Sequence, residues 1–198
     1  ADLILLLSKK WEEKFHEWYP NIKTPTKVLY NACDIIPEID RSLKKKSIIM
    51  AAYLNDNKAP DLLIRAWSKI KHKHPEWSVT IMGNGEVSRF KQLASSLYCD
   101  DIEFPGYLTG SAKEKMWQEA SIYCMCSYNE GFPMVVLEAW NYGINVITTP
   151  VGGLPDVIEE GKNCLTFPFG DYDKLAVQLE LLMTNHQLRE SMAKYARN

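Results

Sequence analysis

The sequence has no apolar run long enough to cross a membrane and no excess of either charge. None of its hydrophobic stretches approaches the roughly 18 residues that a membrane-spanning helix requires. Its 23 basic and 25 acidic residues give a formal net charge of −2, so no overall field attracts nucleic acid or an anionic membrane. Internal repeats and low-complexity tracts are also absent. Hydrophobic residues make up 46% of the chain, which favours a packed core over disorder.

A disulfide framework is also missing. The cysteines are odd in number and follow no disulfide spacing: Cys33, Cys99, Cys124, Cys126 and Cys164. Cys124 and Cys126 alternate within an apolar run, so on a strand they would share one face. We therefore expect buried, reduced thiols of a cytoplasmic protein rather than a metal or redox pair.

The first residues have none of the features of a secretion signal. ADLILLLS, residues 1–8, is too short for a signal core and has no basic segment before it. The chain begins without Met, directly on a strand-like run. We expect it to be a piece of a longer protein.

What the sequence does have is a regular alternation of two patterns. Short apolar runs, typical of buried strands, occur at 3–7, 27–31, 47–53, 77–83, 101–106, 122–127, 145–149 and 164–167. Helical patterns lie between or after them, at 9–18, 61–72, 87–98, 111–120, 133–142, 154–161 and 171–196. Ser8 and Ser111 are predicted helix caps, Glu114 stands at a capping-box position, and a break is expected near Asn185.

This alternation predicts an α/β fold, a doubly wound, Rossmann-like parallel sheet covered by helices on both faces. A polar stretch with two prolines, Pro20 to Thr26, is the expected boundary, with residues 1–22 before it and a domain of residues 23–198 after it. In such sheets ligands bind at the carboxyl ends of the strands. The loops at that edge are where function is expected.

One such loop carries two glutamates, in YNEGFPMVVLEAW (128–140). Glu130 precedes a predicted helix whose first turn suits Pro133, and Glu138 lies more than a turn inside it. Gly131 allows a sharp turn at the mouth of the helix. The free amides of the first turn and the helix dipole together make an anion site.

Carboxylates repel an anion but accept hydrogen bonds from hydroxyl groups. Two of them on either side of an anion site therefore suggest a ligand with sugars at both ends and a diphosphate between them, as in a nucleotide-sugar. The alternative, equally weighted from the residues alone, is that Glu130 faces solvent and Glu138 only forms a salt bridge.

Several segments in order resemble one family. E-G-F-P-M-V-V-L-E closely resembles the E-x7-E motif of retaining glycosyltransferases of family 4, whose two-domain, twin-Rossmann fold is called GT-B. Similar segments flank it: VLYNACD (28–34), VTIMGNGE (79–86), IEFPGYL (102–108) and AWNYGINVITTPVGGLPDVIEEGKNCL (139–165). The resemblance covers nearly all of residues 28–198, which would be the carboxy-terminal, donor-binding half. Residues 1–20 resemble the last strand and helix of the other half.

Carried over by position, the resemblance implies that Glu130 contacts donor-sugar hydroxyls and Glu138 the ribose. Lys58 would contact the diphosphate, so Glu130 and Lys58 are the candidate catalytic residues. The remaining candidate donor contacts are Gly131, Phe132, Pro133 and Met134 around the distal phosphate, Leu108 and Lys113 beside the base, and Tyr53 and Gly83 near the donor.

The sequence departs from the family at one position. The family usually has Gly-Arg shortly before this lysine, and here Ala52 and Tyr53 stand there. One of two cations expected to face the phosphates is therefore missing. This departure concerns the catalytic rate and the affinity for the donor, and it does not concern the fold.

The resemblance implies that the full-length protein moves a hexose from a UDP- or GDP-type sugar to a saccharide or lipid-linked acceptor, with retention and without a metal. Surface polysaccharide or glycolipid synthesis is the expected setting, in the cytoplasm at the inner face of the membrane, with possible peripheral membrane contact and no nucleic acid partner. The fragment alone is expected to be inactive. Three alternatives stay open: a GT-B-fold epimerase, a binding module without catalysis, and a doubly wound domain with no sugar role.

Weaker motifs favour structural roles. Asp171-Tyr172-Asp173 spells D-x-D, a metal motif elsewhere, but after Gly170 it is better explained as a helix cap. The basic run 41–46 is typical of a solvated loop, with an anionic membrane or lipid phosphate as the minority interpretation. The six tryptophans fit core positions of helices more than a carbohydrate platform.

Overall fold

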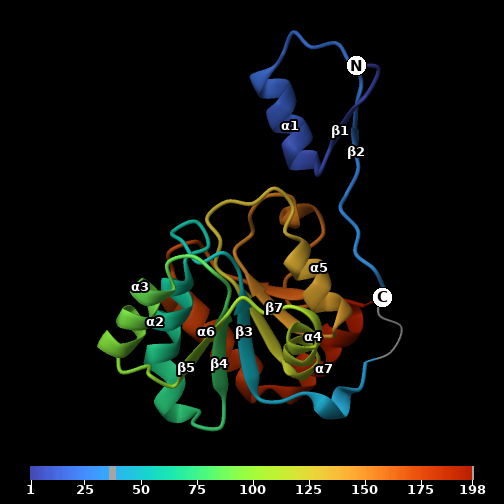
Figure 1. Ribbon diagram of the computed structural model, residues 1–198. Helices are drawn as coiled ribbons and strands as arrows, with labels where there is room; N and C mark the ends of the chain where they lie inside the picture. The colour runs from blue at the N-terminus through green and yellow to red at the C-terminus, as the bar shows by residue number, and fades with distance from the viewer. Residues whose placement is uncertain (36–38, 198) are drawn as a thin grey trace.

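The computed structural model describes residues 1–35 and 39–197 (Figure 1). Its strands are β1 (Ile4–Leu6), β2 (Thr26–Val28), β3 (Ser47–Ala51), β4 (Ser78–Met82), β5 (Ile102–Gly106), β6 (Ile122–Met125), β7 (Asn145–Thr148) and β8 (Cys164–Thr166). Its α-helices are α1 (Lys9–Trp18), α2 (Pro60–Ile70), α3 (Val87–Ser96), α4 (Gly110–Glu119), α5 (Met134–Asn141), α6 (Tyr172–Thr184) and α7 (His186–Tyr195). Three short 3-10 turns are η1 (Arg41–Leu43), η2 (Lys71–Lys73) and η3 (Leu154–Asp156).

The main sheet has six parallel strands in the order β5-β4-β3-β6-β7-β8. Within this sheet the chain first forms β3 in the middle and continues outward through β4 to the edge strand β5. It then returns to form β6 on the other side of β3. This is the doubly wound, Rossmann-like arrangement that the sequence predicted. The strand order reverses between β3 and β6, and in open α/β sheets this switch point is where ligands bind.

Two separate cores cover the two faces of this sheet. Successive residues of a strand point to opposite faces, so Ile48 packs into one core and Ile49 into the other. Side chains of α2, α3 and α6 fill the first core, and side chains of α4 and α5 fill the second. Burial on both sides explains why the central strands β3 and β6 are mostly apolar on both faces, whereas the edge strand β5 alternates in burial.

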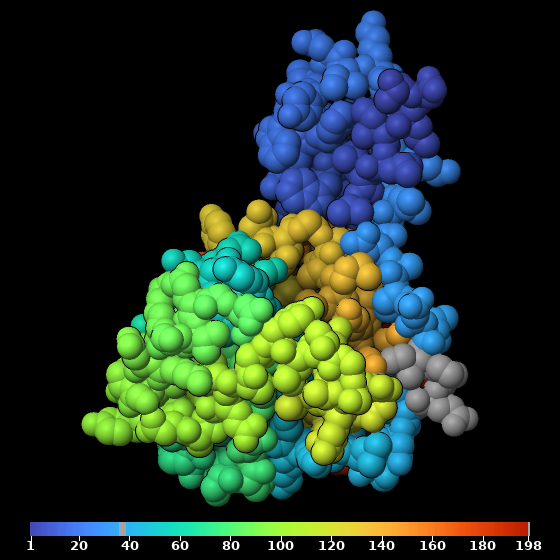
Figure 2. Space-filling view, viewed as in Figure 1, coloured from blue at the N-terminus to red at the C-terminus, as the bar shows by residue number. Residues whose placement is uncertain are grey.

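The first 28 residues form a small unit of their own above the carboxyl-end loops of the main sheet (Figures 1 and 2). In it β2 pairs in parallel with β1, although the sequence placed its strand 27–31 in the following domain. Asp156 anchors this unit to the main body, since its carboxylate accepts a hydrogen bond from the Lys9 backbone N–H at 2.6 Å. It also accepts from the hydroxyl of Tyr30, in the segment that follows the unit, at 3.1 Å. The boundary at residue 22 stays a prediction about domains.

The helix-end predictions were right in part. Ser8 caps α1 and Asp171 caps α6, as predicted, and the predicted break falls at Asn185, whose side chain also caps α7. The cap at Ser111 was wrong: α4 begins at Gly110, and the residue before it, Thr109, makes no side-chain cap bond. The helix expected at 154–161 is only the single turn η3, because Pro155 and Gly161 leave too few helix-forming residues between them.

Cysteines and tryptophans lie mostly where expected. All five cysteines are free thiols; Cys33 is half-buried and the other four are buried. The sulfur atoms of Cys124 and Cys126 lie 3.6 Å apart, and burial raises the pKa of the Cys126 thiol. Four tryptophans are buried, but Trp11 is half-buried and Trp18 is 57% exposed. None of the described helices is long and apolar enough to cross a membrane.

Lys44 makes the basic run 41–46 more than a solvated loop. Its side chain is half-buried and donates to the Trp117 carbonyl at 3.2 Å. Burial, with the nearby charge of Arg41, lowers the pKa of Lys44 to about 7. A lysine in an unfolded chain titrates near 10.4. Between about pH 7 and pH 10 the unfolded state therefore holds the additional proton, and this residue's contribution to stability rises with pH.

Lys44→Met should accordingly stabilise the fold most at about pH 6, and the gain should shrink toward about pH 9.5. The slope of the difference is bounded at about 1.4 kcal/mol per pH unit, the value for one proton. Urea unfolding of both proteins across this range measures it. Lys45→Met, at an exposed neighbour, is the control whose difference should not depend on pH. A pH-independent gain for Lys44→Met would contradict the prediction.

Candidate functional site

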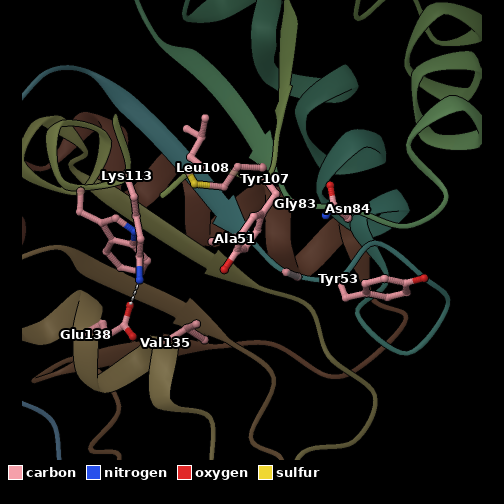
Figure 3. A pocket seen from close by; sticks show the side chains of 12 residues that line it. Ala51, Tyr53, Gly83, Asn84, Tyr107, Leu108, Lys113, Val135 and Glu138 are labelled. Atoms are coloured by element: carbon pink, nitrogen blue, oxygen red, sulfur yellow. Dashed lines mark hydrogen bonds and ion pairs between the residues drawn. The ribbon is translucent and has the colours of Figure 1, made fainter. Parts of the chain in front are cut away.

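A cavity of about 340 Å³ opens at the carboxyl edge of the sheet, between α4 and α5 (Figure 3). Its walls come from the ends of β3, β4 and β5 and from the two helices. Five residues predicted from the sequence line it together: Tyr53, Gly83, Leu108, Lys113 and Glu138. Asn84, from the turn that the sequence placed near the donor, also lines it, as do Tyr107 and Trp117, which the sequence did not single out.

An ion pair closes one side of this cavity. Lys113 on α4 donates to Glu138 on α5 at 2.9 Å, and both side chains are partly exposed. The lysine also lies over the Trp117 ring, 5.6 Å from its centroid. A ligand hydroxyl that reaches Glu138 would share this carboxylate with Lys113 or displace it.

A second ion pair lies at the crevice where the sheet order reverses. Lys58, from the loop after β3, pairs with Glu130, from the loop after β6. The Ser127 hydroxyl also donates to the Glu130 carboxylate, at 2.6 Å. The Glu130 side chain is only 13% exposed, so it does not face open solvent as the alternative interpretation supposed.

Asn57 holds the two loops of this second pair together. Its side-chain oxygen accepts from the Asn129 N–H at 3.2 Å, and its amide donates to the Asn129 carbonyl at 3.1 Å. Its backbone carbonyl accepts from the Tyr128 N–H at 2.7 Å. These three bonds fix Lys58, the next residue, opposite Glu130. An asparagine beside the predicted lysine was the only signal of this role in the sequence.

Between the two ion pairs lies the start of α5. Pro133 precedes the first helical residue instead of occupying the first turn, and Phe132 is buried against the Tyr30 ring. Among residues 1–35 and 39–197, the backbone N–H groups of Gly131, Phe132 and Met134 donate to no protein acceptor. Free amides at a helix N-terminus are suited to bind an anion.

The Gly131 carbonyl in the same loop has two donors. The Gly131 carbonyl accepts from the Trp11 indole at 2.9 Å and from the Gly153 N–H at 2.8 Å. In a trans peptide the C=O and the following N–H point in opposite directions. The Phe132 N–H therefore faces away from Trp11 and Gly153.

The described part of the chain offers no cluster of His, Cys, Asp and Glu suited to a metal ion. In the D-x-D segment, Asp171 accepts the Lys174 N–H at 2.8 Å and Asp173 pairs with Lys69. The cap at Asp171 confirms the prediction, whereas Asp173 forms an ion pair that the sequence did not predict. No arginine lines the cavity among the described residues, and the Tyr53 side chain, 63% exposed, cannot supply a charge.

Comparison with known proteins assigns the family. The model of the family described as glycosyl transferases group 1 matches residues 34–198. The chain belongs to this family. Among curated relatives, an uncharacterized glycosyltransferase of Haemophilus influenzae is 27% identical over 192 residues, covering 94% of this chain and 52% of its own length. A D-inositol 3-phosphate glycosyltransferase of Kribbella flavida is 33% identical over 150 residues, covering 70% of this chain and 35% of its own length.

Solved structures agree on the fold of this group 1 glycosyl transferase domain. Anabaena HepE, in complex with UDP-glucose, superposes with a TM-score of 0.87 at 21% identity, and the match covers all of this chain and 58% of HepE. The six-stranded parallel sheet flanked by helices is that of the carboxy-terminal, Rossmann-like domain of GT-B glycosyltransferases. The chain spans about half the length of the Haemophilus relative.

Proposed function

We propose that this chain is the donor-binding domain of a retaining, family 4 type glycosyltransferase. The full-length protein would move a hexose from a nucleoside-diphosphate sugar to an acceptor hydroxyl, in the synthesis of a surface polysaccharide or glycolipid. The observation that carries the proposal is the row of free amides at the start of α5, with the Glu130–Lys58 pair on one side and the Glu138–Lys113 pair on the other.

Each part of a nucleotide-sugar has a matching group in this arrangement. The base and ribose fit the cavity that contains Leu108, Lys113 and Glu138. The distal phosphate rests on the amides of Gly131, Phe132 and Met134. Glu130 accepts hydrogen bonds from hydroxyls of the sugar, and Lys58, released from part of its pairing, turns toward the diphosphate.

The transfer step follows from this placement. The bond between the anomeric carbon and the distal phosphate oxygen breaks, and its electron pair stays on the phosphate. The acceptor oxygen bonds to the anomeric carbon from the same face, and its proton passes to the departing phosphate oxygen. Preorganised amides and the Lys58 ammonium stabilise the charge that develops there.

Several relatives support the donor and acceptor classes. HepE and the Staphylococcus aureus protein TarM have been solved with UDP, which favours a uridine nucleotide. A Campylobacter jejuni relative is named an N-acetyl-D-galactosaminyltransferase acting on an undecaprenol-linked saccharide, consistent with glycolipid assembly. The family match does not favour an epimerase or a non-catalytic module. Metal independence and the cellular location stay predictions.

Glu138→Gln should weaken UDP binding about tenfold while leaving the fold intact. The change removes a charged acceptor for the ribose hydroxyls, and hydrogen bonds to charged groups contribute roughly 1.5–3 kcal/mol; release of Lys113 offsets part of this. Calorimetric titration of the chain with UDP, GDP and ADP and their glucose conjugates measures the effect and identifies the base.

The control is Glu103→Gln, an exposed carboxylate on β5, which should bind UDP as the parent does. If Glu138→Gln also binds UDP unchanged, the ribose assignment is wrong. If none of the nucleotides binds the parent chain, the proposed function fails.

A further inference from the structure

A second cavity, of about 380 Å³, lies where α1 meets the loops after β6 and β7. Figures 1 and 2 show α1 above these loops, close to the start of α5. Three segments far apart in the sequence line it, with Lys10, Trp11 and Lys14 from α1, Tyr128 and Asn129 from the β6 loop, and Gly152 from the β7 loop. None of these residues belongs to the cavity that contains Glu138.

The fixed charges of this lining are all positive. Among the residues that the structure describes, Lys10 and Lys14 are its only lysines, arginines or carboxylates. Within the described residues neither lysine forms an ion pair. They stand four residues apart on one face of α1, a spacing at which like charges weaken a helix slightly. Two ammonium groups beside one cavity, neither paired with a carboxylate of the described residues, favour the binding of an anion.

The cavity also has aromatic walls. Trp11 lies under the Lys14 ammonium, 5.0 Å from the ring centroid. Tyr128 is 65% exposed, and its ring rests edge-on against Phe169 at 5.0 Å. A large side chain with an apolar face and a polar tip is suited to a ligand that is itself partly apolar and partly hydroxylated.

This second cavity lies next to the candidate site but is separate from the proposed donor-binding groups. Trp11 donates to the Gly131 carbonyl, so α1 occupies the side of the loop opposite the Phe132 N–H. A diphosphate on the free amides is therefore separated from Lys10 and Lys14 by the loop. Two residues of the lining are nevertheless next to Glu130. Asn129 precedes it in the sequence, and Gly152 packs against its backbone carbonyl.

We propose that this cavity binds a negatively charged group, a phosphate or a carboxylate, on the saccharide that accepts the transferred sugar. The inference rests on the proposed function, because only a transferase has an acceptor next to the donor sugar. It specifies the class of that acceptor: an anionic saccharide rather than a neutral one. Lys10 and Lys14 supply the attraction, and Trp11 and Tyr128 flank the ring.

The test is a titration of the nitrogen-15-labelled chain, followed by NMR at the Trp11 indole N–H. Glucose 6-phosphate, glucuronate and glucose are compared at equal ionic strength. We expect both charged sugars to shift the Trp11 signal, with an affinity at least tenfold above that of glucose and falling as salt is added. The two charged probes distinguish a phosphate from a carboxylate preference.

The double variant Lys10→Gln/Lys14→Gln should lose the preference for charged sugars. Lys115→Gln/Lys174→Gln, at lysines outside this cavity, should keep it, and thermal unfolding checks that both variants are folded. Equal binding of glucose and the charged sugars, or unchanged binding in the first variant, would overturn the proposal. If UDP still binds in a Glu138-dependent way, such a result removes only the acceptor inference. Loss of UDP binding by the parent would instead remove the proposed function.

Discussion

Lys58→Met in the full-length protein should lower the transfer rate about 100-fold. In the structure the Lys58 ammonium is paired with Glu130, the residue that directly precedes the free amides at the start of α5. When a diphosphate departs, a fixed cation there offsets the charge that develops, and removing one such group typically lowers kcat by roughly 10² to 10³. The effect is expected to be large because Tyr53 replaces the second cation that the family usually has.

The measurement is kcat with UDP-glucose. A retaining transfer predicts a product with the α-configuration of the donor. Lys69→Met is the matched control, since Lys69 also pairs with a carboxylate, Asp173, but on the exposed surface of α2. Lys58→Arg, which keeps the charge, should recover part of the rate. A change of less than about threefold in Lys58→Met would rule out the proposed role, provided thermal unfolding shows the variant folded.

Gly152→Ala should abolish most UDP binding and destabilise the fold by about 2 kcal/mol or more. Gly152 has φ +61°, and an added Cβ would lie 2.5 Å from the carbonyl oxygens of both Glu130 and Gly131. Both contacts are with backbone, so the loop that carries the free amides must move. The displacement would disturb the Glu130–Lys58 pair and the anion site together.

Gly161→Ala separates this contact from backbone strain. Gly161 has a similar φ of +75°, but no atom lies within 4 Å of an added Cβ, so its substitution carries the strain alone, about 1 kcal/mol. Calorimetry with UDP and urea unfolding compare the two. If both variants bind UDP equally well, the Glu130–Gly131 loop is not the phosphate site.

The chain's local patterns predicted more of the fold than of the contacts in the site. Runs such as SIIMA and IYCM are mostly apolar on both faces because both faces of their strands are buried, and that property is readable from the residues themselves. The Ser8 and Asp171 caps and the break at Asn185 were also readable, since each cap bond reaches only three residues along the chain. The start of α4 was placed one residue too late, at Ser111. The residue that precedes the helix, Thr109, makes no side-chain cap bond, so no capping interaction fixes this helix end.

The site residues divide in the same way. The spacing of Glu130 and Glu138 around a helix start is local, so the anion site between them could be inferred from the sequence. Their partners could not be derived from spacing: Lys58 is 72 residues from Glu130, and Trp11 is 120 residues from Gly131. Lys58 and Lys113 entered as candidates only through the family resemblance, and their pairing with the two glutamates appears only in the structure.

The sequence by itself determined the class of fold, the edge of the sheet at which a ligand would bind, and the two carboxylates that flank the start of α5. These follow from hydrophobic periodicity, turn residues and helix-end chemistry, all of which act over a few residues. Only the tertiary structure decided that β2 pairs with β1 and that each of the two glutamates forms an ion pair with a lysine. It also decided that α1 places Lys10 and Lys14 beside the same loop. Those contacts depend on strand order and on how loops from different strands meet, and no local interaction encodes that order.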